Sequence, residues 1–245
     1  RKNQKPEKRA ELYLIVSAGS VLESEKQLGL AHFVEHMAFN GTKNFKKNEL
    51  INYLESIGIQ FGPELNAYTS FDQTVYMLTV PTDSLEILTK GFLVLEDWAH
   101  NQAFEPTEID KERGVIVEEW RLGRGAQMRM LDKQLPILFK DSKYAERLPI
   151  GEKEIIESFD HKTLIDFYKD WYRPDLIAVA AVGDFDVKEI EGYIKKHFEK
   201  IPYPEQIKQK EFFSIPNHDK TYFAIASDKE AIYSIISMYY KRNPD

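Results

Sequence analysis

The sequence contains no cysteine, and that absence removes several kinds of chemistry at once. A chain without cysteine has no disulfide bond, no thiolate zinc site and no cysteine nucleophile. Any bound metal must therefore be held by histidine, aspartate or glutamate. The absence does not decide the compartment, because a chain without cysteine is compatible with reducing and with oxidising surroundings.

An excess of positive charge and long apolar runs are also missing. The 245 residues have a formal net charge of -7 and an isoelectric point near 5.5, and no basic surface is concentrated in the sequence. We therefore expect no nucleic-acid partner, because phosphate binding needs such a surface. No run of about eighteen apolar residues occurs, so we expect no membrane span in this chain.

The chain does contain enough apolar sequence for a large core, since 42% of its residues are hydrophobic. It begins at Arg1 rather than at methionine, and it ends at Asp245 just after a strongly patterned stretch at 232–240. Both ends have the character of cuts. We therefore expect a fragment of a longer protein, with any signal peptide outside it.

The spacing of apolar residues predicts a mixture of strands and helices. Strands are expected at 10–18, 65–70, 73–80, 176–182 and 221–226. Helices are expected at 29–39, 47–57, 83–100, 160–171 and 187–198, with a long one from 106 to about 139 that kinks near Gly123 and Gly125. This order predicts an α+β fold in which helices pack on a largely antiparallel sheet.

The most informative stretch is His32-Phe33-Val34-Glu35-His36, which falls in the helix expected at 29–39. Residues at i and i+4 lie one turn apart on one helical face, so the two imidazoles can share one ion. A catalytic zinc usually has three protein ligands and a water, and a nearby carboxylate can take a proton from that water. The order H-x-x-E-H is a signature of inverted zinc peptidases, but it requires a third ligand from elsewhere.

Candidates for that ligand lie in the stretch 108–120. Glu112, Ile116 and Glu119 fall at i, i+4 and i+7, so two carboxylates share a helical face with an aliphatic residue between them. The alternative is an ordinary solvated face held by salt bridges, because acidic and basic residues alternate throughout this stretch. The pattern alone leaves both interpretations open.

Three motifs in order give the chain a resemblance to a known family. They are His32 to His36, the stretch Asn66-Ala67-Tyr68-Thr69, and residues 112–119 with the sequence ERGVIVEE. Together they resemble the pitrilysin/insulinase family of zinc peptidases, and within it the bacterial zinc proteases. The resemblance implies a metallopeptidase domain like those of pitrilysin and mitochondrial processing peptidase. It also implies a zinc metalloendopeptidase that hydrolyses peptides or unfolded polypeptides.

The resemblance also implies roles for individual residues. His32, His36 and Glu119 match the ligands of one zinc ion, and Glu35 matches the general base that takes a proton from the zinc-bound water and passes it to the leaving amine. Glu112 matches a carboxylate that supports the site.

Two of the implied assignments have alternatives. Glu118 is the rival third ligand, but the seven-residue spacing from Glu112 favours Glu119, and Glu118 points about a hundred degrees away on a helix. The stretch Asn66, Ala67 and Tyr68 resembles the family's edge strand, on which a peptide substrate lies as an added strand. The alternative is a plain sheet strand with Asn66 in a turn.

The resemblance finally sets expectations about the whole protein. Family members enclose zinc between two homologous halves, each of two domains. We therefore predict a zinc-binding domain at 1–205, a linker and truncated second homologous domain at 206–245, and a C-terminal half or a partner subunit elsewhere. The fragment alone should be weakly active or inactive. The alternatives are a catalytically silent scaffold or peptide-binding subunit, and a structural zinc site. A periplasmic or envelope location is expected, with the cytoplasm as the alternative.

Overall fold

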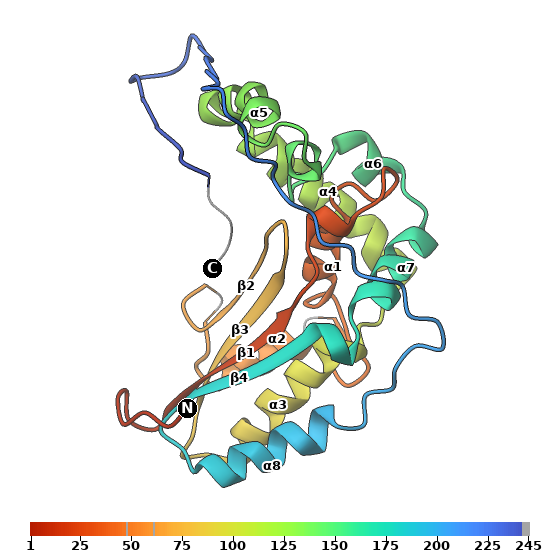
Figure 1. Ribbon diagram of the computed structural model, residues 1–245. Helices are drawn as coiled ribbons and strands as arrows, with labels where there is room; N and C mark the ends of the chain where they lie inside the picture. Colours follow the sequence, from red (N-terminus) through yellow and green to blue (C-terminus); the bar gives the residue numbers. More distant parts are fainter. Residues whose placement is uncertain (48, 61, 242–245) are drawn as a thin grey trace.

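The structure is a computed structural model that describes residues 1–47, 49–60 and 62–241. Its centre is a sheet of four strands, β1 (Arg9–Val16), β2 (Leu65–Thr69), β3 (Thr74–Pro81) and β4 (Ile177–Gly183). The strand order is β2-β3-β1-β4, and all neighbouring strands are antiparallel (Figure 1). The predicted antiparallel sheet is therefore confirmed, and β2 lies at one of its edges.

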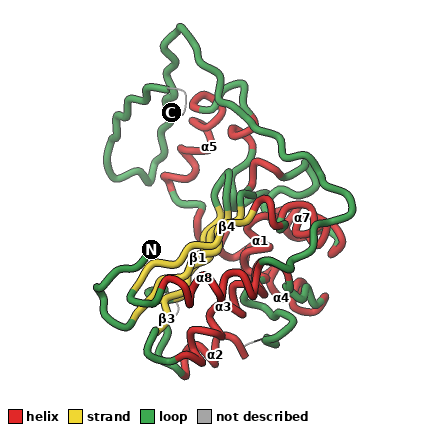
Figure 2. Tube along the Cα trace, turned by 60° about the horizontal axis from the view of Figure 1, so that its bottom comes forward, coloured by secondary structure: helices red, strands yellow, loops and turns green. Residues whose placement is uncertain are grey.

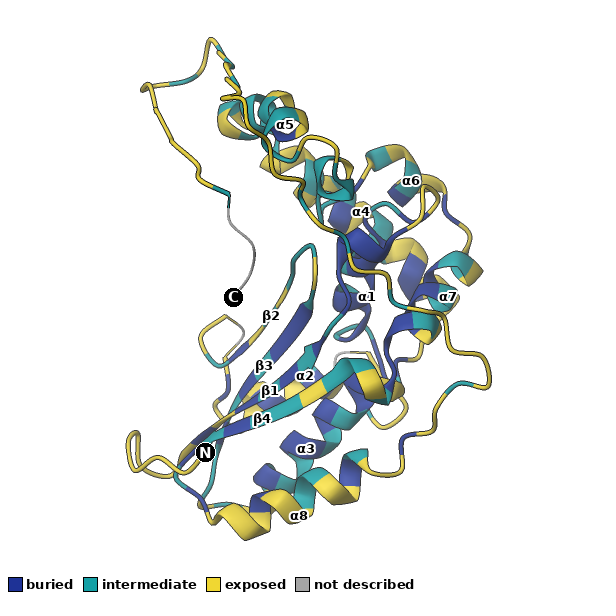
Figure 3. Cartoon of the chain, in the orientation of Figure 1, coloured by how far each residue is buried: buried dark blue, intermediate teal, exposed yellow. Residues whose placement is uncertain are grey.

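The side chains of β1 and β3 explain why these strands lie inside the sheet. Alternate residues of β1 are buried on one face, among them Leu12 and Leu14. The residues of β3 are buried or half-buried along its whole length, as is usual for an interior strand. Leu14 lies opposite Tyr76 of β3, and both are fully buried. Figure 3 shows this core as the dark region shared by the sheet and the helices beside it.

The helices form two groups around the sheet. α3 (Leu85–His100) packs on β1 and β3, and α8 (Val187–Phe198) packs on α3 (Figure 1). The second group gathers at one end of the sheet and comprises α1 (Leu30–Met37), α4 (Pro106–Gly123), α6 (Lys153–Ser158) and α7 (His161–Trp171) (Figure 1). Figure 2 shows α1, α4 and α7 of this group from a second side. The remaining helices are α2 (Glu49–Ser56), α5 (Ala126–Leu138) and short 3-10 helices at Ser20–Leu22, Lys143–Glu146 and Pro174–Leu176.

The long helix predicted from Pro106 consists of two helices. α4 ends at Gly123 and α5 begins at Ala126, so the chain breaks where the kink was expected. Residue 48, inside the helix predicted at 47–57, lies outside the described residues. So do residues 242–245, at the end of the predicted second module. No helix within the described ranges is both long and apolar enough to cross a membrane.

The strand predicted at 221–226 is wrong for this chain. Residues 202–241 contain neither helix nor strand, and they run as an extended segment past α7 and α5 (Figure 1). Phe223 is 76% exposed and Ile225 is 88% exposed. A strand needs a neighbouring strand to satisfy its backbone groups, and the described residues provide none for this segment. The apolar pattern is therefore present without the pairing that would make it a strand.

Both ends of α1 are held by buried contacts. At its start, the carboxylate of Glu23 accepts hydrogen bonds from the backbone N–H of Gly29 at 3.0 Å and of Ala31 at 2.8 Å. These N–H groups have no partner within the helix, so a buried acceptor stabilises its first turn. At its end, the indole Nε1 of Trp98 donates to the carbonyl oxygen of Ala38 at 3.0 Å. The helix that carries both histidines is therefore fixed from two sides.

A glycine pair brings a second segment against the start of α1. Gly29 has a φ of +97° and Gly151 a φ of +70°, which are values that favour glycine. A Cβ on Gly151 would lie 2.3 Å from the Cα of Gly29, so only glycine fits there. This close approach holds Pro149 and Ile150 beside α1, where both line a pocket described below.

Glu23 gives a first testable prediction. Glu23→Ala leaves two buried N–H groups without an acceptor, and we expect it to lower the free energy of unfolding by about 2 kcal/mol or more. Burial raises the pKa of Glu23 from 4.5 to about 8, against the opposing effect of the two N–H groups and Arg147. The folded protein then keeps a proton that the unfolded chain releases, so stability should fall as pH rises from 4.5 to 8.

The measurement is urea denaturation across that pH range. Glu23→Gln is the matched control, because it keeps the shape and one acceptor oxygen but cannot ionise. We expect it to lose less stability than Glu23→Ala and to lack this pH dependence. Equal pH dependence in the unaltered chain and in Glu23→Gln would contradict the prediction.

Candidate metal centre and peptide cleft

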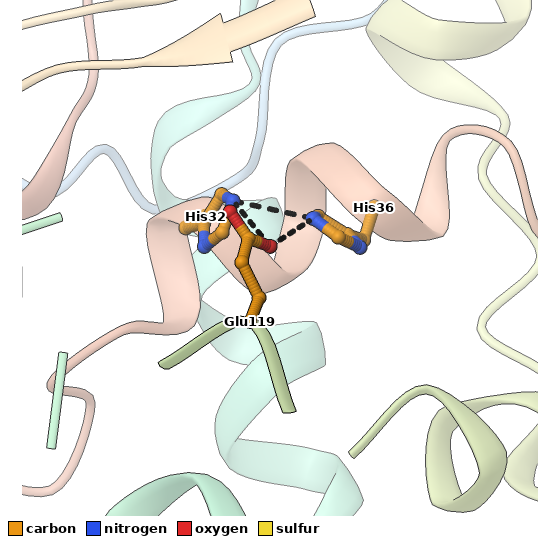
Figure 4. Close-up of side chains that lie close together, drawn as sticks. All are labelled: His32, His36 and Glu119. Carbon is orange, nitrogen blue, oxygen red and sulfur yellow. Dashed lines mark hydrogen bonds and ion pairs between the residues drawn. The ribbon is translucent and has the colours of Figure 1, made fainter. Parts of the chain in front are cut away.

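His32 and His36 lie side by side on α1, and Glu119 reaches them from α4 (Figure 4). The Nε2 atoms of the two histidines are 3.2 Å apart. One carboxylate oxygen of Glu119 lies 3.8 Å from Nε2 of His32 and 3.5 Å from Nε2 of His36. Within the part of the chain that the structure describes, this is the one group of three acidic or histidine side chains placed to hold a metal ion.

The neighbouring Glu118 faces elsewhere. Its carboxylate accepts two hydrogen bonds from the guanidinium of Arg121, at 2.8 and 2.6 Å, on the exposed side of α4. Adjacent helical residues point about a hundred degrees apart, which separates the two carboxylates. The salt-bridged face considered from the sequence therefore exists, but it includes Glu118 and excludes Glu119.

Glu112, two turns earlier on the face of α4 that Glu119 shares, contacts His36. Its Oε1 lies 2.7 Å from Nδ1 of His36. An ionised carboxylate can only accept, so Nδ1–H of His36 is the donor. This hydrogen bond leaves Nε2 of His36 directed at His32 and Glu119. Carboxylates commonly orient metal-binding histidines in this way.

Asn40 is a site residue that sequence reasoning missed. Its side-chain amide donates to Oε2 of Glu112 at 2.8 Å and to the carbonyl oxygen of His36 at 3.1 Å. In the sequence, Asn40 lies just beyond the helix expected at 29–39 and was not assigned a role. The available signal was its position four residues after His36, although α1 itself ends at Met37.

The charges of the cluster suit a divalent cation. Burial, together with a smaller effect of the nearby His36, lowers the pKa of His32 to about 4, so His32 is neutral at pH 7. Burial opposes protonation of His36, but hydrogen bonds with Glu112 and Glu119 outweigh it and raise the pKa of His36 to about 9. The hydrogen bond with His36 lowers the pKa of Glu119. A cation bound here would therefore displace one proton from His36.

The donor set fits zinc. It consists of two imidazole nitrogens and one carboxylate oxygen, which is a common combination in catalytic zinc sites. Among the described residues, the buried Nδ1 of His32 has no hydrogen-bond partner, so none of their carboxylates orients that ring. Within this part of the chain, a carboxylate therefore orients His36 but not His32.

Glu35 lies beside the cluster but points to the sheet. It is 7% exposed, and its Oε2 accepts a hydrogen bond from the hydroxyl of Thr69 on β2 at 2.5 Å. Burial raises the pKa of Glu35, against the opposing effect of this hydrogen bond. A buried carboxylate with a raised pKa is suited to accept and return a proton near neutral pH.

The edge strand β2 borders the same pocket. The pocket, which the histidines and Glu35 also line, has a volume of about 550 Å³. Asn66, Ala67, Tyr68 and Thr69 of β2 line it together with Pro149 and Ile150. Asn66 lies within β2 rather than in a turn. Within the described sheet, β2 pairs only with β3, so its other edge can receive an added strand.

Comparison with known proteins decides the family. Residues 1–136 match the family described as insulinase, peptidase family M16, and residues 158–242 match the peptidase M16 inactive domain. The chain belongs to the insulinase family. Its match begins at the first residue and includes all the predicted site residues, so the resemblance inferred from the three motifs is confirmed.

Relatives of this insulinase-family chain include zinc proteases of the PqqL type. It is 41% identical over 242 residues to a zinc protease PQQL-like of Arabidopsis thaliana, covering 98% of this chain and 25% of that protein. It is 37% identical over 237 residues to the probable zinc protease PqqL of Escherichia coli, covering 96% of this chain and 25% of that protein. The chain therefore spans about a quarter of the length of these relatives.

A solved structure supports the fold directly. The first half of the periplasmic protease PqqL from Escherichia coli matches with a TM-score of 0.81 at 36% identity, covering 88% of this chain and 45% of that one. Pitrilysin matches with a TM-score of 0.71 at 22% identity, which shows the shared fold alone. The predicted α+β metallopeptidase fold is confirmed.

Proposed function

We propose that this chain is the zinc-binding domain of a metalloendopeptidase that hydrolyses peptide bonds in peptides or unfolded polypeptides. The observation that carries the proposal is the meeting of His32, His36 and Glu119, with the buried carboxylate of Glu35 beside them in one pocket. Three ligands with a nearby proton acceptor are the combination that catalytic zinc sites use, whereas structural sites usually have four protein ligands.

Each residue has a separate task in this proposal. His32, His36 and Glu119 hold one zinc ion, which when bound polarises the scissile carbonyl and lowers the pKa of water. Glu35 accepts a proton from the attacking water and delivers it to the leaving amine. Glu112 holds the ring of His36 through Nδ1, so that Nε2 keeps its direction.

The substrate is expected to bind as an added strand along β2. Asn66, Ala67 and Tyr68 belong to an edge strand that borders the pocket. A peptide that extends the sheet there is held through its backbone, so binding does not require one particular side chain. The hydrogen bond from Thr69 to Glu35 links this strand to the proposed base.

The second candidate is a scaffold or peptide-binding subunit without catalysis. The same edge strand would support it, because peptide binding needs only β2. The cluster of His32, His36, Glu119 and Glu35 favours the peptidase, since a scaffold has no use for a buried carboxylate beside three metal ligands. Peptide binding without hydrolysis in the longer protein would favour the scaffold.

We further propose that residues 1–205 form the zinc-binding domain and that residues 206–245 lead into a second domain. Ile201 is the last residue of the core cluster, and the following segment exposes many of its large apolar side chains. Such a segment is suited to pack its apolar side chains against a C-terminal half or a partner subunit. Periplasmic PqqL as a relative favours the periplasm or cell envelope, with the cytoplasm as the alternative.

These proposals predict that the 245-residue chain binds one zinc ion but hydrolyses peptides poorly. We expect its rate of peptide hydrolysis to be on the order of 100-fold below that of the same chain joined to its C-terminal half. In this proposal the substrate is aligned between the two halves, and the isolated chain supplies only one of them. The measurement combines bound zinc with cleavage of a fluorescence-quenched peptide. Rapid cleavage by the isolated chain would contradict the need for a second half, and lack of zinc would contradict the metal site.

A further inference from the structure

Glu112 makes two hydrogen bonds, one with each carboxylate oxygen. Oε1 accepts from His36 and Oε2 accepts from the amide of Asn40. A carboxylate held through one oxygen can still rotate about its last bond, whereas one held through both oxygens has a fixed plane. The side chain of Glu112 is only 12% exposed, so water has little access to replace either partner.

The orientation of the Asn40 amide follows from its neighbours. Both groups that Nδ2 contacts, the carbonyl oxygen of His36 and the carboxylate of Glu112, can only accept hydrogen bonds. The NH2 end must therefore face them. Asn40 also carries no charge, so it fixes Glu112 through a hydrogen bond rather than through an ion pair.

We propose that Asn40 is a positioning residue of the metal centre, which fixes the carboxylate of Glu112 and through it the ring and tautomer of His36. This inference rests on the proposed zinc site. Asn40 lies four residues beyond His36, after the last residue of α1, while Glu112 comes from α4. The contact thus joins the two elements that supply the three metal ligands.

A purely structural role for Asn40 is the competing explanation. Its bond to the carbonyl oxygen of His36 also satisfies an acceptor near the end of α1, which stabilises the helix whether or not Glu112 is present. The two roles differ in one respect. Positioning requires Glu112, and stabilisation of the helix end does not.

A double-mutant cycle on zinc affinity separates the two roles. We expect Asn40→Ala to weaken zinc binding about 10-fold, as loss of a partner of a metal ligand commonly does. In a Glu112→Ala background the same change should have less than about a threefold effect, because the group through which Asn40 acts is gone. Zinc dissociation constants are measured by competition with a chromophoric chelator, and circular dichroism of the metal-free variants verifies folding.

An inverted pair provides the second test. Asn40→Asp places two carboxylates face to face, whereas Asn40→Asp combined with Glu112→Gln restores a donor and an acceptor. The glutamine oxygen can accept from His36 while its NH2 group donates to the aspartate. We expect the double variant to bind zinc about fivefold or more tightly than Asn40→Asp alone.

The outcomes are distinct. Equal weakening by Asn40→Ala in both backgrounds, or an inverted pair no better than Asn40→Asp, would overturn the positioning role while leaving the zinc site intact. Zinc binding that survives His32→Ala unchanged would overturn the proposed zinc site and this inference with it.

Discussion

Glu35→Gln is expected to reduce peptide hydrolysis by the longer protein about 100- to 10,000-fold while leaving zinc bound. Glutamine has the shape of glutamate and can still accept the hydrogen bond from Thr69, but it cannot take a proton from water. Glu35 is absent from the group of His32, His36 and Glu119, so the metal ligands remain. The measurements are kcat on a quenched peptide and the zinc content of the purified variant.

The matched control is Glu55→Gln, the same chemical change on the exposed face of α2. It should leave both kcat and zinc content unchanged. Hydrolysis by Glu35→Gln at the unaltered rate would remove Glu35 from the proposed mechanism. Loss of zinc from Glu35→Gln would instead make it a metal ligand.

Glu119→Gln is expected to weaken zinc affinity by about 100-fold or more. Removing a residue that only hydrogen-bonds to a metal ligand usually weakens metal affinity less than this. The change keeps the side chain's shape and removes the negative charge that lies 3.5 Å from His36 and 3.8 Å from His32. Zinc affinity is measured by chelator competition in the 245-residue chain, so the result does not depend on the C-terminal half.

The chain offers a matched control at the adjacent residue. Glu118→Gln removes an identical charge from the same helix, but that carboxylate pairs with Arg121 on the exposed side. It should change zinc affinity less than about twofold, because exposed ion pairs contribute little. A larger loss from Glu118→Gln than from Glu119→Gln would exchange the roles of the two glutamates.

The sequence predicted most elements because their patterns are local. The apolar stripe of α3, the alternation in β1 and the glycines between α4 and α5 each depend on residues close together in the chain, where Gly123 ends α4 and Gly125 precedes α5. The difference between Glu118 and Glu119 was also predictable, because helical geometry alone separates their directions. The strand expected at 221–226 failed because strand formation depends on a partner that no local pattern supplies.

The supporting residues of the site could not be predicted in the same way. Thr69 lies 34 residues from Glu35, and Asn40 lies 72 residues from Glu112. Glu23 was part of a stretch with the composition of a polar loop, yet it is fully buried. Each contact exists only because distant elements meet, and a polar residue in a loop has the same local signature whether or not it has such a partner.

The clamping of α1 at both ends has a consequence for metal exchange. Glu23 and Trp98 hold the helix through groups that do not touch the ligands, and neither contact requires a cation. The scaffold that carries the proposed ligands is therefore preorganised, and ordering the backbone would consume little of the free energy of zinc binding. A chelator should remove zinc and leave a folded apoprotein, and the ion can return without refolding, unlike in domains whose folding depends on their metal.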